Sequence, residues 1–221
     1  MAYTKPFAWS YSALTGFELC PKKHAAEKVY KQIPYEQNEA AKYGETVHKH
    51  FENRLLKATP LPLDLRHHEP VMLKLYDAPG EGLPEQRLTL TRDLQPTGWF
   101  DDDAWCRGIV DYTKINGGSA LIVDHKTGRM QDGFDQLDLM YAMMTAHMPE
   151  ILSGRGAFYW TKTKRMPNKK YIQSDVSTIW AAFLPRVKRM EEAQKKEDFP
   201  AKPNFLCKSY CKVTNCPYHG V

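Results

Sequence analysis

Apolar residues recur at every third or fourth position in four stretches of the chain, which is the spacing of an amphipathic helix. Ser10 or Ser12 can cap the first helix, and Pro21 predicts a break inside it because proline disrupts a helix interior. The final stretch ends in charged residues, which indicate an exposed helix end. The four helices that this pattern predicts span residues 10–31, 39–57, 134–148 and 174–199.

Shorter runs of β-branched and aromatic residues indicate strands between these helices. We expect strands within residues 87–115, 119–126 and 156–172, and the last range holds two strands around Met166. Residues 59–84 are rich in proline and glycine and predict a loop with short extended pieces. The order of helices, meandering strands, a helix, further strands and a last helix predicts a mixed α/β domain with a central sheet.

The composition narrows the class of protein. The chain has 221 residues, of which 42% are hydrophobic and 26% charged, so it can form one sizeable globular domain. No apolar run approaches the roughly 18 residues that a membrane span needs, and residues 1–10 lack the apolar core of a secretory signal. We therefore expect no membrane partner and a reducing, cytoplasmic compartment. A net charge of +5 is compatible with a nucleic-acid partner.

The hairpin expected over residues 108–126 carries the candidate chemistry. If Gly117 and Gly118 form a two-residue loop with positive φ at both positions, Asp111 lies directly opposite Asp124. Lys126, two residues beyond Asp124, projects to the same face of the sheet. Two carboxylates at that separation suit Mg²⁺ or Mn²⁺, which lowers the pKa of bound water and polarises a phosphoryl oxygen. The lysine can then orient the attacking water or offset charge that develops on a phosphate.

Two alternatives apply to this hairpin. A turn shifted by one residue pairs Asp111 with Ile122 and removes the arrangement. A hairpin with Asp124 and Lys126 on its solvent-exposed face makes them an ordinary charge pair.

Three cysteines cluster near the C-terminus. Cys207, Cys211 and Cys216 lie within ten residues of one another, and His219 follows three residues later. In a reducing compartment such a cluster indicates metal ligands rather than disulfides. These four residues can form a tetrahedral Zn²⁺ site, or Cys20 can supply the fourth ligand of an iron–sulfur cluster. Thiols buried in a small satellite core are the third interpretation.

Two motifs of the hairpin match a known family. They are Gly-Ile-Val-Asp at residues 108–111 and Val-Asp-His-Lys-Thr at residues 123–127. Both resemble the PD-(D/E)XK nuclease superfamily, and the most similar branch is that of the RecB-type nuclease domains. That branch also has a helical Gly-Thr-x-x-His motif upstream, and this chain keeps its spacing at Gly44 and His48 although Glu45 stands in place of the usual threonine.

The resemblance implies a role for each residue that matches. His48 joins Asp111 and Asp124 as a metal ligand, and the main-chain carbonyl of His125 completes the shell, while Lys126 assists the water. On its own, His48 lies on an apolar stripe, where a buried and hydrogen-bonded histidine is the alternative. An imidazole ligand favours Mn²⁺ over Mg²⁺.

The next motif of the family is Gln-x-x-x-Tyr on the helix after the lysine. Here Gln136 and Tyr141 are five residues apart rather than four, which places them about 140° apart around a helix. We therefore include Gln136 in the catalytic site and expect Tyr141 in the core.

The cysteine pattern has a counterpart in the same branch. Some RecB-type nucleases, including the CRISPR-adaptation exonucleases and the AddB-type subunits, carry an N-terminal Cys-Pro and three C-terminal cysteines that bind a cluster joining the two ends of the domain. The resemblance implies a [4Fe–4S] cluster and a cysteine-rich clasp in this chain, with Zn²⁺ as the alternative. The C-terminal spacing departs from the usual one, with three and then four intervening residues instead of two and five. The proposed ligands are Cys20, Cys207, Cys211 and Cys216.

The resemblance also implies a fold and an activity. The fold is a restriction-endonuclease-like α/β core in one domain over residues 1–221. Its expected parts are N-terminal helices at 1–58, a catalytic sheet core at 85–173, a long helix at 174–199 and the cysteine-rich tail at 200–221. The activity is that of a metal-dependent exonuclease acting on single-stranded DNA or duplex ends, in a bacterial, archaeal or phage-infected host cell.

Basic and aromatic residues near the last strands are candidates for DNA contacts. Phe158, Tyr159 and Trp160 precede Lys162, Lys164 and Arg165, and this combination can stack bases and hold phosphates. A core strand with a solvated turn is the alternative.

Other conspicuous residues have simpler interpretations. Asp101, Asp102 and Asp103 cannot share one strand face, so they predict a polar turn. We expect His67 and His68 to be solvated in their proline-rich loop. Two rival functions remain, a non-catalytic nucleic-acid-binding protein with a zinc module at its C-terminus and a phosphohydrolase for small molecules.

Overall fold

The computed structural model describes residues 6–34 and 36–221. The chain divides into two compact units, which we describe separately. The sheet unit consists of residues 37–180, and the terminal unit consists of the described parts of residues 1–36 together with residues 181–221. The expected organisation of residues 1–221 as one domain stays a prediction.

A mixed five-stranded sheet forms the centre of the sheet unit, and its strand order follows the sequence. The pairs β1–β2, β2–β3 and β4–β5 are antiparallel, while β3 and β4 run parallel. A parallel pair requires a crossover, which the helix between β3 and β4 supplies. The strands are β1 (Glu81–Leu90), β2 (Cys106–Asn116), β3 (Ser119–Lys126), β4 (Ser153–Trp160) and β5 (Asn168–Ile172).

The helix α3 (Glu39–Lys57) begins and ends where its periodicity predicts. The Asn38 side chain accepts a hydrogen bond from the backbone N–H of Ala41 at 2.8 Å and so caps the first turn. The buried side chains of Val47, Phe51 and Leu55 lie on one stripe of the helix. This stripe packs in a core cluster with side chains of the sheet, among them Tyr112, Val123 and Tyr159.

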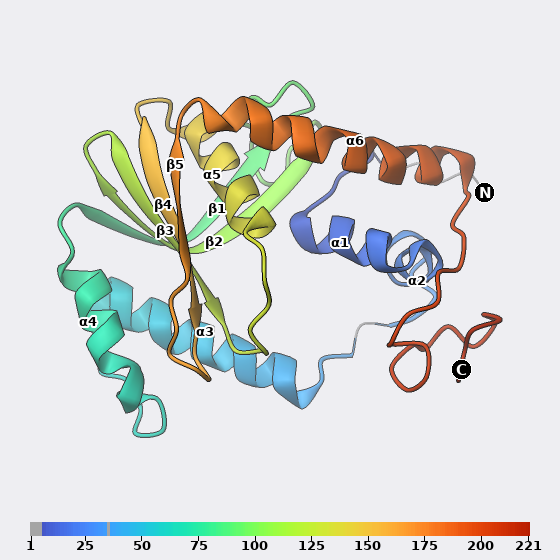
Figure 1. The fold of residues 1–221 in the computed structure, drawn as a ribbon, viewed down its shortest axis with the longest axis horizontal. Coiled ribbons are helices and arrows are strands. Elements are labelled where there is room, and N and C mark those ends of the chain that lie inside the picture. Colours follow the sequence, from blue (N-terminus) through green and yellow to red (C-terminus); the bar gives the residue numbers. More distant parts are fainter. Residues whose placement is uncertain (1–5, 35) are drawn as a thin grey trace. The chain divides into compact units, whose positions relative to one another are not determined.

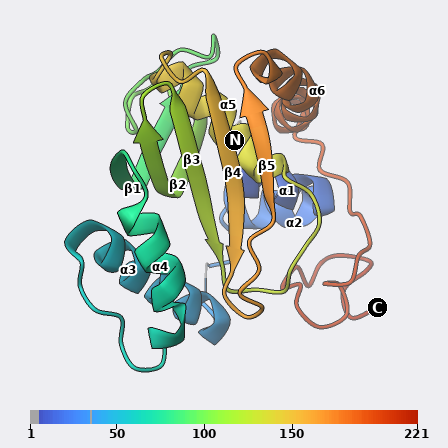
Figure 2. The same ribbon diagram turned by 60° about the vertical axis from the view of Figure 1, so that its left-hand side comes forward.

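The prediction of a loop over residues 59–84 is wrong. A 3₁₀ turn (Arg66–His68) leads into α4 (Glu69–Asp77), and β1 begins at Glu81. Pro70 lies in the first turn of α4, where proline lacks only an N–H that has no helical partner, so it starts this helix instead of breaking it. Figures 1 and 2 show α3 and α4 together on one face of the sheet and α5 on the other.

His68 is buried rather than solvated. Its side chain is 2% exposed, and its Nδ1 lies 2.7 Å from the hydroxyl of Tyr159 on β4. Burial lowers the pKa of His68 to about 4, and the positive charges of His67 and Lys164 act in the same direction. A neutral imidazole that shares a hydrogen bond is stable in this core.

The helix α5 (Asp135–His147) covers the other face of the sheet, as its apolar pattern predicts. Tyr141 is fully buried and stacks on Tyr171 of β5 with ring centroids 4.7 Å apart, which confirms its expected place in the core. A Cβ atom at Gly154 would lie 2.7 Å from the Tyr141 ring, so glycine is required for this close approach. The crossover helix therefore lies directly on β4.

The hairpin between β2 and β3 has the predicted register, with Asn116 opposite Ser119 and Tyr112 opposite Val123. The prediction for the loop is wrong in one detail, because Gly117 adopts a positive φ of 56° and Gly118 does not. A close approach accounts for Gly118, since a Cβ atom there would lie 3.2 Å from the main-chain oxygen of Glu150. The register is therefore the predicted one although the second glycine adopts another conformation, and its last regular pair, Tyr112 with Val123, directly precedes Asp111 and Asp124.

The terminal unit contains the first helices. The helix α1 (Tyr11–Leu19) begins after Ser10, whose side chain accepts a hydrogen bond from the N–H of Ala13. The predicted break occurs at Cys20, which has extended backbone angles, and α2 (Pro21–His24) continues as a π-helical turn (Ala25–Val29).

The helix α6 (Asp175–Lys196) begins in the sheet unit and continues in the terminal unit. Within the terminal unit, two nitrogens of Arg186 donate to the two carboxylate oxygens of Glu18 at 2.8 and 2.7 Å. The tail that follows α6 contains turns and lies against the first helices through Lys22, whose N–H donates to the carbonyl of Pro200. In the described part of the chain, we find no helix that combines the length and the apolar character needed to cross a membrane.

Candidate active site

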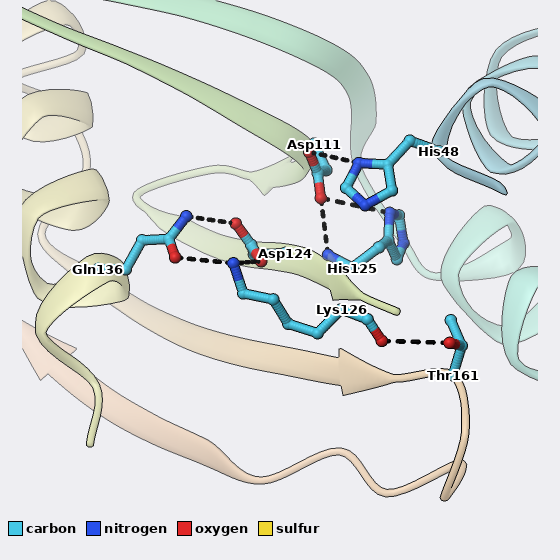
Figure 3. Close-up of polar contacts among 7 residues, drawn as sticks. All are labelled: His48, Asp111, Asp124, His125, Lys126, Gln136 and Thr161. Carbon is cyan, nitrogen blue, oxygen red and sulfur yellow. Dashed lines mark hydrogen bonds and ion pairs between the residues drawn. The ribbon is translucent and has the colours of Figure 1, made fainter. Parts of the chain in front are cut away.

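Asp111 of β2 lies between two histidines. Its Oδ2 accepts the backbone N–H of His125 at 2.7 Å, and its Oδ1 lies 3.3 Å from Nδ1 of His48 on α3 (Figure 3). The regular pairing of β2 with β3 ends one residue earlier, at Tyr112 and Val123. The carboxylate therefore binds a main-chain N–H of the neighbouring strand at the point where regular pairing stops.

Asp124, Lys126 and Gln136 form a closed triangle of polar contacts (Figure 3). Nε2 of Gln136 donates to Oδ1 of Asp124 at 2.7 Å, while Nζ of Lys126 donates to Oε1 of Gln136 at 2.7 Å. The same Nζ lies 2.7 Å from Oδ2 of Asp124. Gln136 is in the first turn of α5, so the crossover helix brings this amide to the end of β3.

The two carboxylates of the site have pKa values that are shifted in opposite directions. Burial raises the pKa of Asp124 to about 7, and the negative charge of Asp111 adds to this rise while Lys126 opposes it. Burial also acts to raise the pKa of Asp111, but the hydrogen bond from His48, electrostatic interaction with the two nearby imidazoles and the hydrogen bond from the backbone N–H of His125 lower it overall. Asp111 is therefore the carboxylate that stays ionised, and Asp124 is the one that gains a proton more easily.

The pKa values of the two histidines, His48 and His125, are also shifted in opposite directions. Burial acts to lower the pKa of His48, but its hydrogen bond to Asp111 and the nearby carboxylates raise it above the ordinary value. Burial lowers the pKa of His125 to about 4. The His125 ring packs edge-on against Phe51, with centroids 5.0 Å apart, and remains neutral inside the core.

The donor types of this site fit a divalent cation. Two carboxylates and an imidazole are the ligands that Mg²⁺ and Mn²⁺ take in proteins, and a bound cation would relieve the repulsion that raises the pKa of Asp124. Among residues 6–34 and 36–221, however, no three His, Cys, Asp or Glu side chains already converge as a metal-binding set. The carboxylate oxygens face His48, His125, Lys126 and Gln136 instead.

The predicted DNA-contacting residues fall into two groups. Phe158, Tyr159 and Trp160 are at most 6% exposed, so the core-strand interpretation holds for these three residues of β4. The three basic side chains are exposed in the turn that follows β4; they are Lys162, Lys164 and Arg165.

Thr161 joins this basic turn to the site. Its N–H donates to the main-chain carbonyl of Lys126 at 2.9 Å. Its hydroxyl donates to the same carbonyl at 3.2 Å (Figure 3). Nothing in the sequence pattern around Thr161 indicated this contact, because it depends on the parallel pairing of β3 with β4. The exposed cations therefore follow directly after a residue bound to the candidate catalytic lysine.

In the terminal unit, four cysteines line one narrow cavity, and they are Cys20, Cys207, Cys211 and Cys216. All four are free thiols, and Cys20 and Cys207 are buried. The sulfur of Cys207 accepts the N–H of Asn204 at 3.4 Å. His219 is exposed and does not line this cavity, whereas Cys20 does.

The remaining cysteine and the acidic run have structural roles. Cys106 is fully buried against Met143, with 3.7 Å between their sulfur atoms, and is part of the core. Asp101 accepts hydrogen bonds from the N–H of Gly98 and the hydroxyl of Thr97 in a turn, as predicted for this polar segment.

Comparisons with known proteins agree with this fold. The sequence model of the PD-(D/E)XK nuclease superfamily matches residues 8–221, so the chain belongs to that superfamily. The solved structure of SSO0001 is 16% identical, with a TM-score of 0.52 over 97% of this chain and 88% of that chain. The "putative exonuclease" of Eubacterium rectale is 15% identical, with a TM-score of 0.58 over 95% of this chain and 88% of that chain. A search of curated proteins finds no significant match.

These comparisons confirm the predicted family and the mixed α/β restriction-endonuclease-like fold. At such low identity the two structures show the fold alone. Membership of the superfamily supports a nuclease and hence a nucleic-acid substrate.

Proposed function

We propose that this chain is a divalent-metal-dependent deoxyribonuclease that works as an exonuclease. The observation that carries the proposal is the buried Asp124 bound to Lys126 and Gln136, beside a second carboxylate, Asp111, that faces His48. The superfamily supports phosphodiester hydrolysis, and the name of the similar Eubacterium rectale protein supports exonuclease action. We infer DNA as the substrate, either single-stranded or at a duplex end.

The metal would be Mg²⁺ or Mn²⁺, which nucleases of this superfamily generally use. Its ligands would be His48, Asp111, Asp124 and the main-chain carbonyl of His125. Such a cation supplies a water of lowered pKa and polarises a phosphoryl oxygen. The raised pKa of Asp124 supports this assignment, because burial and the charge of Asp111 disfavour its ionised form, which a bound cation would stabilise.

The chain's own residues would position the substrate. Lys126 would hold the attacking water or a phosphate oxygen with its remaining N–H, and Gln136 would keep the ammonium at the end of β3. The exposed cations of the turn after β4 would bind the phosphates that flank the cut. These cations are Lys162, Lys164 and Arg165.

The test follows product length with time on strands labelled at the 5′ or the 3′ end, with Mg²⁺, Mn²⁺ or EDTA. We expect single nucleotides to be released progressively from one end, and Lys126→Ala to remove this activity. Lys169→Ala is the matched control, because Lys169 also lies 2.7 Å from an aspartate, Asp138, but outside the site. Full activity of Lys126→Ala, or cleavage in EDTA, contradicts the proposed mechanism; binding without cleavage favours a non-catalytic nucleic-acid-binding protein.

We also propose that the four cysteines of the terminal unit hold a [4Fe–4S] cluster and so form the cysteine clasp. The cavity that they share supports this assignment, and the exposed position of His219 argues against the alternative Zn²⁺ site formed by three cysteines and this histidine. Protein purified without oxygen should absorb near ~400 nm and contain iron and sulfide. Cys211→Ser should abolish this absorbance, whereas Cys106→Ser should keep it, and one zinc per chain without iron contradicts the cluster.

A further inference from the structure

The ring of Phe158 lies beneath the ammonium group of Lys126. The distance from Nζ to the ring centroid is 5.3 Å, which is within the range of a cation–π contact. Phe158 is paired with Asp124 across the parallel strands β3 and β4, and it is 6% exposed. Parallel pairing therefore places this ring next to the carboxylate that the lysine also contacts.

A second aromatic side chain holds this ring in place. Phe134 stacks on Phe158 with centroids 6.1 Å apart and an angle of 16° between the rings. Phe134 immediately precedes α5, and Gln136 lies in the first turn of that helix. The start of α5 thus supplies both the amide that accepts from Lys126 and the ring that supports its aromatic contact.

The ring differs from the two oxygen partners of Lys126 in one chemical respect. An ammonium has three N–H donors, and Gln136 and Asp124 each offer an oxygen at 2.7 Å. An aromatic face attracts the positive charge without requiring a directed hydrogen bond. It can therefore restrict the lysine while one donor stays available for a water or a phosphate oxygen.

We propose that Phe158 is a positioning residue for Lys126, and this inference rests on the proposed catalytic role of that lysine. The negative face of the ring holds the charged end of a long and flexible side chain beside Asp124. Leucine at this position would fill much of the same space but would offer no negative face.

Substitution of Phe158 by phenylalanines with one, two and three ring fluorines tests this proposal. Each fluorine withdraws electron density from the face of the ring and hardly alters its shape. We expect kcat to fall stepwise to about one tenth across the series with KM unchanged, because the lost contact is one that orients a catalytic group. Phe158→Tyr should keep activity, and Phe158→Leu should lose it.

The matched control is the same fluorination at Phe183. That ring is also buried and also lies beneath a cation, with the guanidinium carbon of Arg186 4.9 Å from its centroid, but it belongs to the terminal unit. We expect no change in kcat for Phe183. A flat response at Phe158, or an equal fall at both positions, overturns the proposal.

A second measurement does not depend on activity. Protons of the Lys126 side chain above an aromatic face should resonate upfield in NMR spectra of lysine-labelled protein, and Phe158→Leu should remove this shift. Lys126→Arg assigns the resonance. If Lys126→Ala is fully active while the upfield shift is present, the proposed catalytic role fails and the contact stands; if the shift is absent, the positioning role fails by itself.

Discussion

Two lysines of this protein make nearly the same contacts. Lys126 lies 2.7 Å from an oxygen of Asp124 and 5.3 Å from the ring centroid of Phe158. Lys169 lies 2.7 Å from an oxygen of Asp138 and 5.2 Å from the ring centroid of Tyr171. Local geometry therefore does not distinguish the candidate catalytic lysine from a lysine on the edge strand.

The surroundings of the two pairs differ. The side chain of Asp124 is 5% exposed and that of Asp138 is 18% exposed, while the two lysines are 28% and 43% exposed. Burial and then the charge of a second carboxylate, Asp111, raise the pKa of Asp124. Asp138 instead accepts a hydrogen bond from the hydroxyl of Tyr171 at 2.8 Å. Burial and a neighbouring negative charge destabilise the ionised form of Asp124, so this ion pair, unlike the exposed one, favours the binding of a further cation.

The largest expected difference concerns the two aspartates. Asp124→Asn should lower kcat on the order of 10³-fold, because it removes both a proposed metal ligand and the partner of Lys126. Asp138→Asn should leave kcat unchanged. Nuclease assays on folded variants, checked by circular dichroism, measure the effect, and equal activities would mean that the buried pair is no more catalytic than the exposed one.

A smaller effect on kcat is expected from substitution of Gln136, whose amide contacts both Asp124 and Lys126. Gln136→Ala removes one hydrogen bond to the Lys126 ammonium and should lower kcat about tenfold. Tyr171→Phe removes the hydroxyl that serves Asp138 and should not affect kcat. Steady-state kinetics at saturating substrate compares them, and wild-type kcat for Gln136→Ala would show that the triangle does not position the lysine.

The pH dependence of the free energy of unfolding should also differ between variants of Asp124 and variants of Asp138. The pKa of Asp124 is about 7 in the folded state and about 3.9 in the unfolded state. Between these two pH values the folded protein therefore binds a proton at Asp124 that the unfolded chain does not bind. The contribution of Asp124 to the free energy of unfolding therefore falls as the pH rises from about 4 to about 7. His125, whose pKa is lowered to about 4, acts in the opposite direction, so the difference between wild type and variant is the quantity to follow.

Urea unfolding in EDTA at several pH values measures this difference. Asp124→Asn should gain stability relative to wild type as the pH rises through this window, and Asp138→Asn should not. A difference that stays constant with pH would show that burial does not shift the pKa of Asp124 upward.

The smallest effect is expected at the exposed lysine. Lys169→Ala should change the free energy of unfolding by less than about 1 kcal/mol, because exposed ion pairs are screened by solvent. High salt should remove most of this difference. Urea unfolding at low and high ionic strength measures it, and a larger, salt-independent loss would place this pair among the buried contacts.

Local pattern was sufficient for the elements whose stabilising contacts are close in sequence. The periodicity of α3 and the bounds of β3 were predicted as they occur, and the hairpin has the predicted register from Asn116 and Ser119 to Tyr112 and Val123. The helix α4 was missed because proline and glycine dominate the composition of its region, although Pro70 lies where a helix begins. The burial of His68 was not predicted, because it depends on Tyr159, which lies 91 residues away in the sequence.

The sequence by itself determined the hairpin, its two carboxylates and the lysine, because turn chemistry and the two-residue period of a strand are local. Only the tertiary structure decided which other groups meet them. The parallel pairing of β3 with β4 brings Phe158 and Thr161 to Lys126, and the crossover helix brings Gln136. These contacts arise because a parallel pair must be closed by a long connection, whose packing on the sheet no local pattern specifies.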